Sequence, residues 1–270
     1  MARVEVLAVG REILTGRRLE SNANWVAKRI ATLGGQLQRI AVVDDDIEAI
    51  GAEIANAKAN GTDVLVITGG LGPTFDDVTL EGVAKALGVE LEPSAEARQF
   101  IEDRYHELFS AGLVPEDGLN PAREKMACLP AGSNWFENPF GTAPGVTVIH
   151  KNMQIFCLPG VPQELYAMFD LAVVGSLAKT FDRSGFAELT LPTDATDESM
   201  LTRIARDLIE RHKGLHVKTN PTYFGDAEGL HITLSVHAKD ATTAKQTLEI
   251  VRAELEEALA AIAEENDRDA

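Results

Sequence analysis

Short apolar runs alternate with stretches of helical periodicity along the first two-thirds of the chain. Apolar runs of a few residues that end at Gly or Asp are typical of buried strands in a parallel sheet. We expect a buried strand over 4–9, an apolar strand over 64–67 and a further strand over 36–43, with helices over 22–33, 47–59 and 80–87. Repeated strand–helix units of this kind predict an α/β fold, with a parallel-rich sheet and helices on both faces.

The loops that follow these strands are the first candidates for a site. Ligands of such sheets bind at the carboxyl ends of the strands. Gly10, Asp44 and Gly69 each lie at such an end, so their loops are expected to converge. Asp45, with Glu48 three residues later, resembles a capping box that begins the helix over 47–59.

The region from about residue 88 to 180 continues the pattern around one irregular stretch. Residues 111–131 are rich in Pro and Gly and predict a long connection, which is often functional or mobile. We expect a helix over 94–110, a strand pair over 146–150 and 154–158 with a turn at Lys151-Asn152, and a helix from Pro162 towards Phe169.

The pattern changes near residues 181–185, where a smaller set of elements begins. We expect strands over 186–191, 215–219 and 230–238, a capped helix over 196–212, and a last helix from Asp240 to about 262, with a frayed tail. This order indicates a small α+β domain. The predicted domains are therefore 1–180 and 185–270.

The most distinctive motif is TGGLGPTFDDVT, residues 68–79, between a predicted strand and a predicted helix. Glycines permit close backbone approach to an anion, and a helix start favours negative charge. Gly69, Gly70 and Gly72, with Pro73 and Thr74, are therefore candidate phosphate ligands. Asp76 and Asp77 have two alternative roles: they hold a metal or act in acid/base chemistry, or they cap the helix.

Three further blocks carry candidate chemistry. GREILTGRRLESN, residues 10–22, offers carboxylates and arginines suited to phosphate. NPFGTAPG, residues 138–145, is either a second anion loop or a plain turn. LPGVPQEL, residues 158–165, is a candidate ligand loop or a plain strand-to-helix turn. The candidates from these blocks are Glu12, Glu20, Asn22, Asn138, Gly141, Thr142, Gly145, Pro159 and Gly160.

Composition limits the partners of the chain. A net charge of −17 opposes nucleic-acid binding, which depends on Lys and Arg. Two cysteines are too few for a disulfide framework, and Cys157 in an apolar run is expected to be a buried, inert thiol. The amino-terminus has the wrong layout for a signal peptide, and apolar stretches fall short of the ~20 residues of a membrane helix. We expect a cytoplasmic protein with no membrane partner.

Together, these blocks resemble the competence/damage-inducible protein A (CinA) family. TGGLGPTFDDVT is similar to the family hallmark almost letter for letter, and the other blocks follow in the family's order. The resemblance covers about residues 4–170, and the rest resembles the KH-type domain that often follows. Glu20 stands where the family has Asp, and Arg11 replaces a residue that is often small or acidic. Longer members carry a nicotinamide-mononucleotide deamidase domain, which we expect this chain to lack.

The resemblance implies a molybdopterin-binding-like (MoCF) domain, in which Asp77-Val78-Thr79 matches a segment that binds the pterin phosphate region. CinA-type domains are associated with hydrolysis of ADP-ribose to AMP and ribose 5-phosphate, with Mg²⁺ or Co²⁺ and K⁺. The implied protein is an ADP-ribose pyrophosphatase that forms a homodimer. Asp76, Asp77 and Glu20 would be catalytic, the first two would hold the metal, and Asn22, Asp44 and Thr79 would join the ligand contacts.

Two other hypotheses stay open. The chain could bind molybdopterin or a related phosphorylated pterin without turnover. It could also be a regulatory or scaffold protein with a degenerate site, an alternative that Arg11 and Glu20 leave open. The KH-type resemblance does not predict RNA binding, because the GxxG clamp of such domains is not found over 186–262, where only GDAEG at 225–229 is close.

Overall fold

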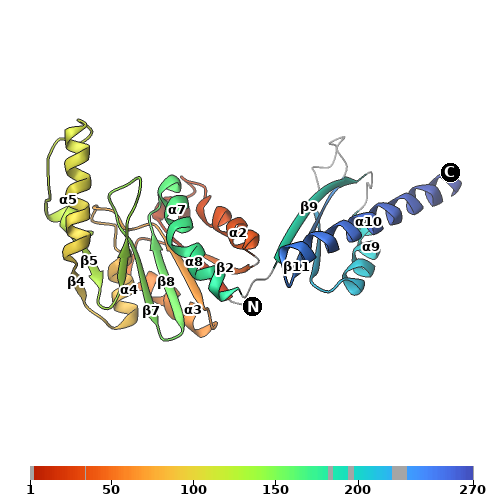
Figure 1. The fold of residues 1–270 in the computed structure, drawn as a ribbon, viewed down its shortest axis with the longest axis horizontal. Helices are drawn as coiled ribbons and strands as arrows, with labels where there is room; N and C mark the ends of the chain where they lie inside the picture. The colour runs from red at the N-terminus through yellow and green to blue at the C-terminus, as the bar shows by residue number, and fades with distance from the viewer. Residues whose placement is uncertain (1–2, 34, 182–184, 194–197, 221–229, 270) are drawn as a thin grey trace. The chain divides into compact units, whose positions relative to one another are not determined.

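The computed structural model describes residues 3–33, 35–181, 185–193, 198–220 and 230–269. The chain forms two compact units. Unit 1 consists of Met1–Ile30 and Gln36–Thr180, and unit 2 of Ala31–Gly35 and Phe181–Ala270. Figure 1 shows unit 1 as a layered α/β domain and unit 2 as a small sheet with the helices α9 and α10.

Unit 1 is built on a six-stranded sheet in the order β2-β1-β3-β8-β7-β6. The first four strands are mutually parallel, and β7 and β6 continue the sheet in antiparallel pairing. The parallel-rich sheet predicted from the sequence is therefore confirmed. The strands are β1 (Arg3–Val9), β2 (Gln36–Val43), β3 (Val64–Thr68), β6 (Asn134–Phe136), β7 (Gly145–His150) and β8 (Met153–Leu158).

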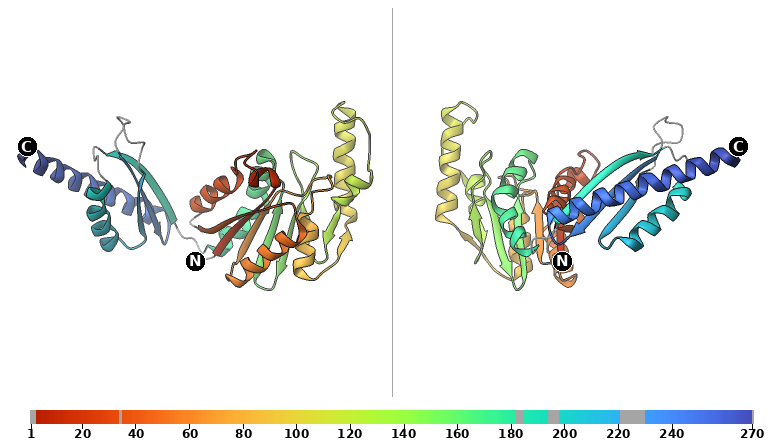
Figure 2. Two further views of the ribbon diagram at one scale, coloured as in Figure 1. Left: turned by 180° about the vertical axis from the view of Figure 1, so that it is seen from behind. Right: turned by 45° about the vertical axis from the view of Figure 1, so that its right-hand side comes forward.

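Helices cover both faces of this sheet, as predicted. Figures 1 and 2 show α3 and α4 on one face and α2, α7 and α8 on the other. Apolar residues of β1, β3 and β8 pack with Ile50 and Ile54 of α3 and Val83 of α4 in one core. The helices are α1 (Arg11–Leu14), α2 (Asn22–Thr32), α3 (Ile47–Ala59), α4 (Thr79–Leu87), α5 (Ala95–Ser110), α7 (Pro162–Met168) and α8 (Val174–Thr180), with a π-helical turn at Phe169–Val173.

The irregular connection predicted over 111–131 is wrong in part. It contains the short helix α6 (Pro121–Lys125), which Asn120 caps by accepting a hydrogen bond from the Arg123 N–H at 3.0 Å. It also contains β5 (Cys128–Pro130), which pairs with β4 (Leu91–Pro93) in a two-stranded sheet. Both elements are too short to leave a periodic signal in the sequence.

Unit 2 has the predicted strand–helix–strand–strand–helix order. Its antiparallel sheet, in the order β10-β11-β9, packs on two helices around a separate core that includes Leu208, Leu234 and Val251. The elements are β9 (Gly185–Thr193), α9 (Glu198–Arg211), β10 (Leu215–Asn220), β11 (Leu230–Ala238) and α10 (Ala241–Asp269). The helix α10 continues through the tail that we expected to fray. The predicted cap of α9 at residue 196 and the GDAEG segment lie outside the described residues.

Candidate functional site

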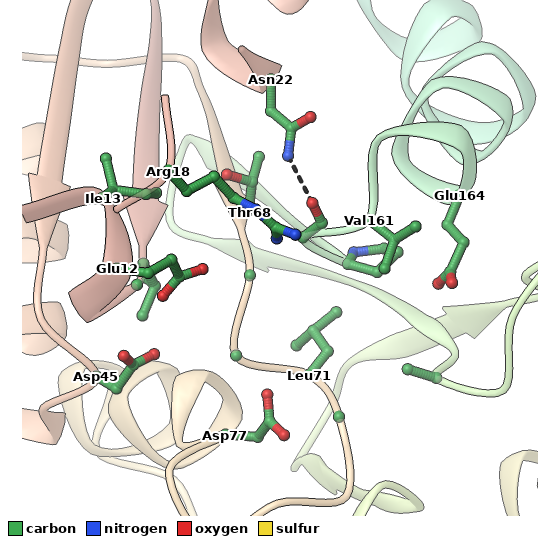
Figure 3. A pocket seen from close by; sticks show the side chains of 18 of the residues that line it. Glu12, Ile13, Arg18, Asn22, Asp45, Thr68, Leu71, Asp77, Val161 and Glu164 are labelled. Atoms are coloured by element: carbon green, nitrogen blue, oxygen red, sulfur yellow. Dashed lines mark hydrogen bonds between the residues drawn. The ribbon is translucent and has the colours of Figure 1, made fainter. Parts of the chain in front are cut away.

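A pocket of about 520 Å³ lies in unit 1 where β1, β3 and β8 end (Figure 3). Its walls come from the segment after β1, the glycine-rich turn after β3, residues 142–143, and the segment after β8. This volume falls in the usual range for small-molecule pockets, and the position is the one where parallel sheets bind ligands. All four blocks singled out in the sequence therefore contribute to one cavity.

The glycine-rich turn is packed so closely that side chains are excluded. Gly69 and Gly70 have φ of +95° and +66°. A Cβ on Gly69 would lie 2.3 Å from the Val9 carbonyl oxygen, and one on Gly70 would lie 2.3 Å from Thr79 Oγ1. Thr79 is fully buried and donates its hydroxyl to the Gly69 carbonyl at 2.8 Å. Within the described part of the chain, the N–H groups of residues 70–72 have no acceptor, so they are available to an anionic ligand.

Asp76 and Asp77 close this turn and do not cap the following helix. The residue at the N-cap of α4 is Val78, which makes no side-chain cap, so the capping alternative is wrong. The Asp77 carboxylate accepts hydrogen bonds from Thr74 N–H at 2.9 Å and Thr74 Oγ1 at 2.6 Å. Asp76 also accepts from Thr74 Oγ1, and this bond lowers the pKa of Asp76. Lys125 of α6 donates to the carbonyls of Thr74 and Asp77 at 2.5 and 2.6 Å, which fixes the turn from behind.

Carboxylates gather on one side of the pocket. Figure 3 shows Glu12, Asp45 and Asp77 on the same side, and Asp76 lines the cavity with them. Burial raises the pKa of Asp45, and the negative charges of Glu12 and Asp76 raise it further. A phosphate ligand that faces these groups needs a cation between them, because like charges at short range repel.

Three consecutive aspartates after β2 have three different roles. Asp44, an expected ligand contact, instead forms a two-pronged ion pair with Arg11, whose Nε and Nη2 lie 3.0 and 2.7 Å from its carboxylate oxygens. Asp45, the predicted helix cap, accepts the Arg11 backbone N–H at 2.9 Å and faces the pocket. The actual cap of α3 is Asp46, which accepts from the Ala49 N–H at 2.8 Å. The prediction of Asp45 as the cap is therefore wrong by one position, and the aspartate that lines the pocket is Asp45 and not Asp44.

The segment before α2 forms another wall. Glu20, an expected catalytic residue, lines the pocket, but its carboxylate accepts the Ala23 N–H at 2.6 Å and so stabilises the start of α2. Asn22 is buried and donates its amide to the Gly160 carbonyl at 2.9 Å. Its Oδ1 is a buried acceptor without a partner in the described structure. The Arg18 side chain extends into the pocket between Ile13 and Val161 (Figure 3).

The block NPFGTAPG contributes less to the cavity than expected. Thr142 lines it, but Asn138 is buried in the turn, where its Oδ1 accepts the N–H groups of Phe140 and Gly141 at 3.1 and 2.9 Å. Gly145 belongs to β7, where an added Cβ would lie 2.3 Å from the Phe136 ring. The plain-turn alternative therefore describes most of this block.

The structure thus divides the predicted site residues into two groups. Outside the pocket lining lie Asp44, Thr79, Asn138, Gly141 and Gly145. The expected residues that do line the pocket are Glu12, Glu20, Asn22, Gly69, Gly70, Gly72, Pro73, Thr74, Asp76, Asp77, Thr142, Pro159 and Gly160.

Three charged lining residues, Arg18, Asp45 and Glu164, were not assigned to the site from the sequence. Asp45 is missed because its neighbours have the same side chain, so composition cannot tell which one faces the pocket. Arg18 and Glu164 belong to blocks that the sequence singles out, but helix and loop direction decide which member of a block reaches the cavity.

Other candidate chemistry is limited in the described part of the molecule. No group of three or more His, Cys, Asp or Glu side chains there is arranged to hold a metal ion. Cys157 is fully buried, as predicted, and burial raises its pKa to about 12. None of the described helices is long and apolar enough to cross a membrane.

These features define an α/β domain with a small-molecule pocket at the carboxyl ends of its parallel strands. A family model described as "Probable molybdopterin binding domain" matches residues 5–179. The chain belongs to this family.

Two relatives and one solved structure are similar to a large part of the chain. The chain is 38% identical over 245 residues to Protein TK1472 of Thermococcus kodakarensis, covering 91% of this chain and 94% of the relative. It is 39% identical over 228 residues to Protein PH0439 of Pyrococcus horikoshii, covering 84% and 88%. Its structure is similar to the CinA protein of Thermoplasma acidophilum, described as having unknown function, with a TM-score of 0.58 and 36% identity over 65% of this chain and 97% of that one.

Proposed function

We propose that the pocket binds a phosphorylated nucleotide sugar and that the protein hydrolyses the pyrophosphate bond of ADP-ribose or a similar compound, releasing AMP and ribose 5-phosphate. The observation that carries this proposal is the presence of carboxylates and available backbone N–H groups together in the lining of one cavity. The N–H groups of residues 70–72 suit a phosphate, and the carboxylates suit a cation that offsets its charge.

A divalent cation fits this donor set in the manner usual for Mg²⁺, which takes one or two carboxylates and completes its coordination with water and substrate phosphate. Asp76 and Asp77 are the residues that would hold it, with Asp45 beside them. A cation bound there would polarise a phosphoryl oxygen and offset negative charge. Potassium dependence, homodimer formation and the KH-type character of unit 2 remain predictions from the family resemblance.

The residues of the chain would otherwise position the ligand. The N–H groups of residues 70–72 donate to one phosphate, and Arg18 offers a charged fork to the other. Asp45, whose pKa is raised, is suited to accept a proton from the attacking water. Glu20 has a structural role at the start of α2, which makes it a weaker candidate for catalysis than Asp45.

The test is AMP release from ADP-ribose with Mg²⁺ or Co²⁺ and K⁺. We expect Asp77→Asn and Asp45→Asn each to lower kcat at least about tenfold, because each removes a charge next to the reacting phosphate. Glu81→Gln is the matched control, since Glu81 lies in the first turn of α4 and outside the pocket lining. No AMP from the wild type, or full activity in Asp77→Asn, would refute the proposal.

A second candidate is binding of molybdopterin or a related pterin phosphate without turnover. Membership of the molybdopterin-binding family favours it. Calorimetric titration separates the two, because tight binding of the pterin with no hydrolysis of ADP-ribose supports the second candidate and overturns the first.

A further inference from the structure

Glu164 is a pocket carboxylate that the proposed hydrolysis does not use. It lies in the first turn of α7, is half-buried, and lines the cavity. Figure 3 shows it on the far side of Leu71 from Glu12 and Asp45. The Glu164 carboxylate therefore lies apart from the carboxylates of Glu12 and Asp45, and a cation bound near those two groups would not account for its presence.

The surroundings of Glu164 hold its carboxylate in place. Asn138 donates its Nδ2–H to Glu164 Oε2 at 2.7 Å and to the Ala143 carbonyl at 3.0 Å. Asn138 is only 1% exposed, so this donor is itself fixed. A Cβ on Gly141 would lie 2.4 Å from Glu164 Oε2, so only glycine leaves room for the carboxylate. A side chain held in this way loses little freedom when a ligand binds.

We propose that Glu164 is a specificity residue that accepts hydrogen bonds from the vicinal hydroxyls of a ribose in the bound nucleotide sugar. An ionised carboxylate only accepts hydrogen bonds, and Asn138 occupies one position on Oε2, which leaves Oε1 and part of Oε2 for a diol. A phosphate is repelled from this end, whereas neutral sugar hydroxyls are not. Carboxylates bind ribose hydroxyls in this way in dinucleotide-binding folds.

The lining of the pocket favours recognition of a ligand through polar groups rather than through stacking. Within the described structure, Phe, Tyr and Trp are all missing from the residues that line the cavity. An aromatic ring would thus have no aromatic side chain to stack on, and stacking supplies much of the binding of such rings. Hydroxyl recognition by a fixed carboxylate needs no such partner.

The inference rests on the proposed function, and the experiment keeps the two apart. Binding is measured by calorimetry for ADP-ribose, for its analogue lacking the 2-hydroxyl of the terminal ribose, and for its analogue lacking the 2′-hydroxyl of the adenosine ribose. Each ligand is tested on wild type, Glu164→Ala and Glu164→Gln. Glu137→Ala is the control, because Glu137 is exposed and outside the pocket lining. Urea unfolding shows that each variant is folded.

In the wild type, we expect removal of one of the two hydroxyls to weaken binding about tenfold to a hundredfold, as for a hydrogen bond to a charged group. In Glu164→Ala and Glu164→Gln, removal of the same hydroxyl should have less than about a threefold effect. An equal loss in wild type and both variants overturns the role of Glu164 but leaves the function intact. Failure of the wild type to bind ADP-ribose at all overturns the proposed function, and this inference with it.

Discussion

Replacing Gly70 by Ala tests whether the packing of the glycine-rich turn, and not only its backbone conformation, requires glycine. Gly70 has φ of +66°, and its added Cβ would lie 2.3 Å from the buried Thr79 Oγ1. Gly88, which ends α4, is the matched control. Its φ is +69°, but an added Cβ there would meet nothing within 4 Å.

Both substitutions place alanine in the left-handed backbone region, but only Gly70→Ala also disturbs a buried hydrogen bond. Alanine in the left-handed region costs about 1–2 kcal/mol, partly offset by the loss of freedom in the unfolded chain, so Gly88→Ala should destabilise unit 1 by about 1 kcal/mol. Gly70→Ala must also displace the hydroxyl that Thr79 donates to the Gly69 carbonyl. A buried hydrogen bond lost in this way costs about 1–3 kcal/mol, so the total should be about 3 kcal/mol.

Urea unfolding followed by tryptophan fluorescence measures this difference. The chain has two tryptophans, Trp25 and Trp135, and both belong to unit 1, so the signal reports the unit that holds the pocket. Equal free energies of unfolding for Gly70→Ala and Gly88→Ala would show that the contact with Thr79 does not constrain the turn, and the reasoning would be refuted.

Three further predictions concern residues whose environments differ sharply. Under native conditions, iodoacetamide should label Cys128 but not the buried Cys157, giving one adduct per chain and two after unfolding; two native adducts would contradict the burial. Asp46→Ala should lower the free energy of unfolding by about 1 kcal/mol in urea, because it removes the cap of α3, and an unchanged midpoint would count against that cap. The pKa of Asp45 is raised in the folded state, so its ionisation lowers stability as pH rises above the unfolded value near about 4. Asp45→Asn should therefore be more stable than wild type at neutral pH, with the gap closing in acid; a constant gap would argue against this cause.

Long apolar runs and periodic helices were predictable from the sequence because burial alone determines them. The strands β1, β3 and β8 are buried among helices on both faces, and their apolar side chains have no other stable location. The short strands β4 and β5 are different, since they exist only through pairing with each other across more than thirty residues. The conformational preferences of the neighbouring residues do not indicate which distant strand β4 or β5 will pair with.

Within the site, too, the sequence predicts the motif but not the role of each residue in it. The motif after β3 indicates an anion-binding turn because only glycine permits its backbone. The roles of Asp44, Asp45 and Asp46 are set by Arg11, which lies 34 residues from Asp45 and binds two of them. Three identical side chains in a row have the same local preferences, so the choice among them depends on a distant contact.

The pairing of β3 with β8 means that two walls of the pocket are synthesised at different times. The two strands lie side by side in the sheet, yet the ribosome makes β8 only after about ninety further residues. The hydrogen bond from Asn22 to the Gly160 carbonyl joins residues that are 138 positions apart, so the acceptor is synthesised long after the donor. Closing such long loops is slow compared with forming local helices. The segment after β8 forms one wall of the cavity, so a nascent chain that stops before β8 has no complete pocket with which to bind a ligand.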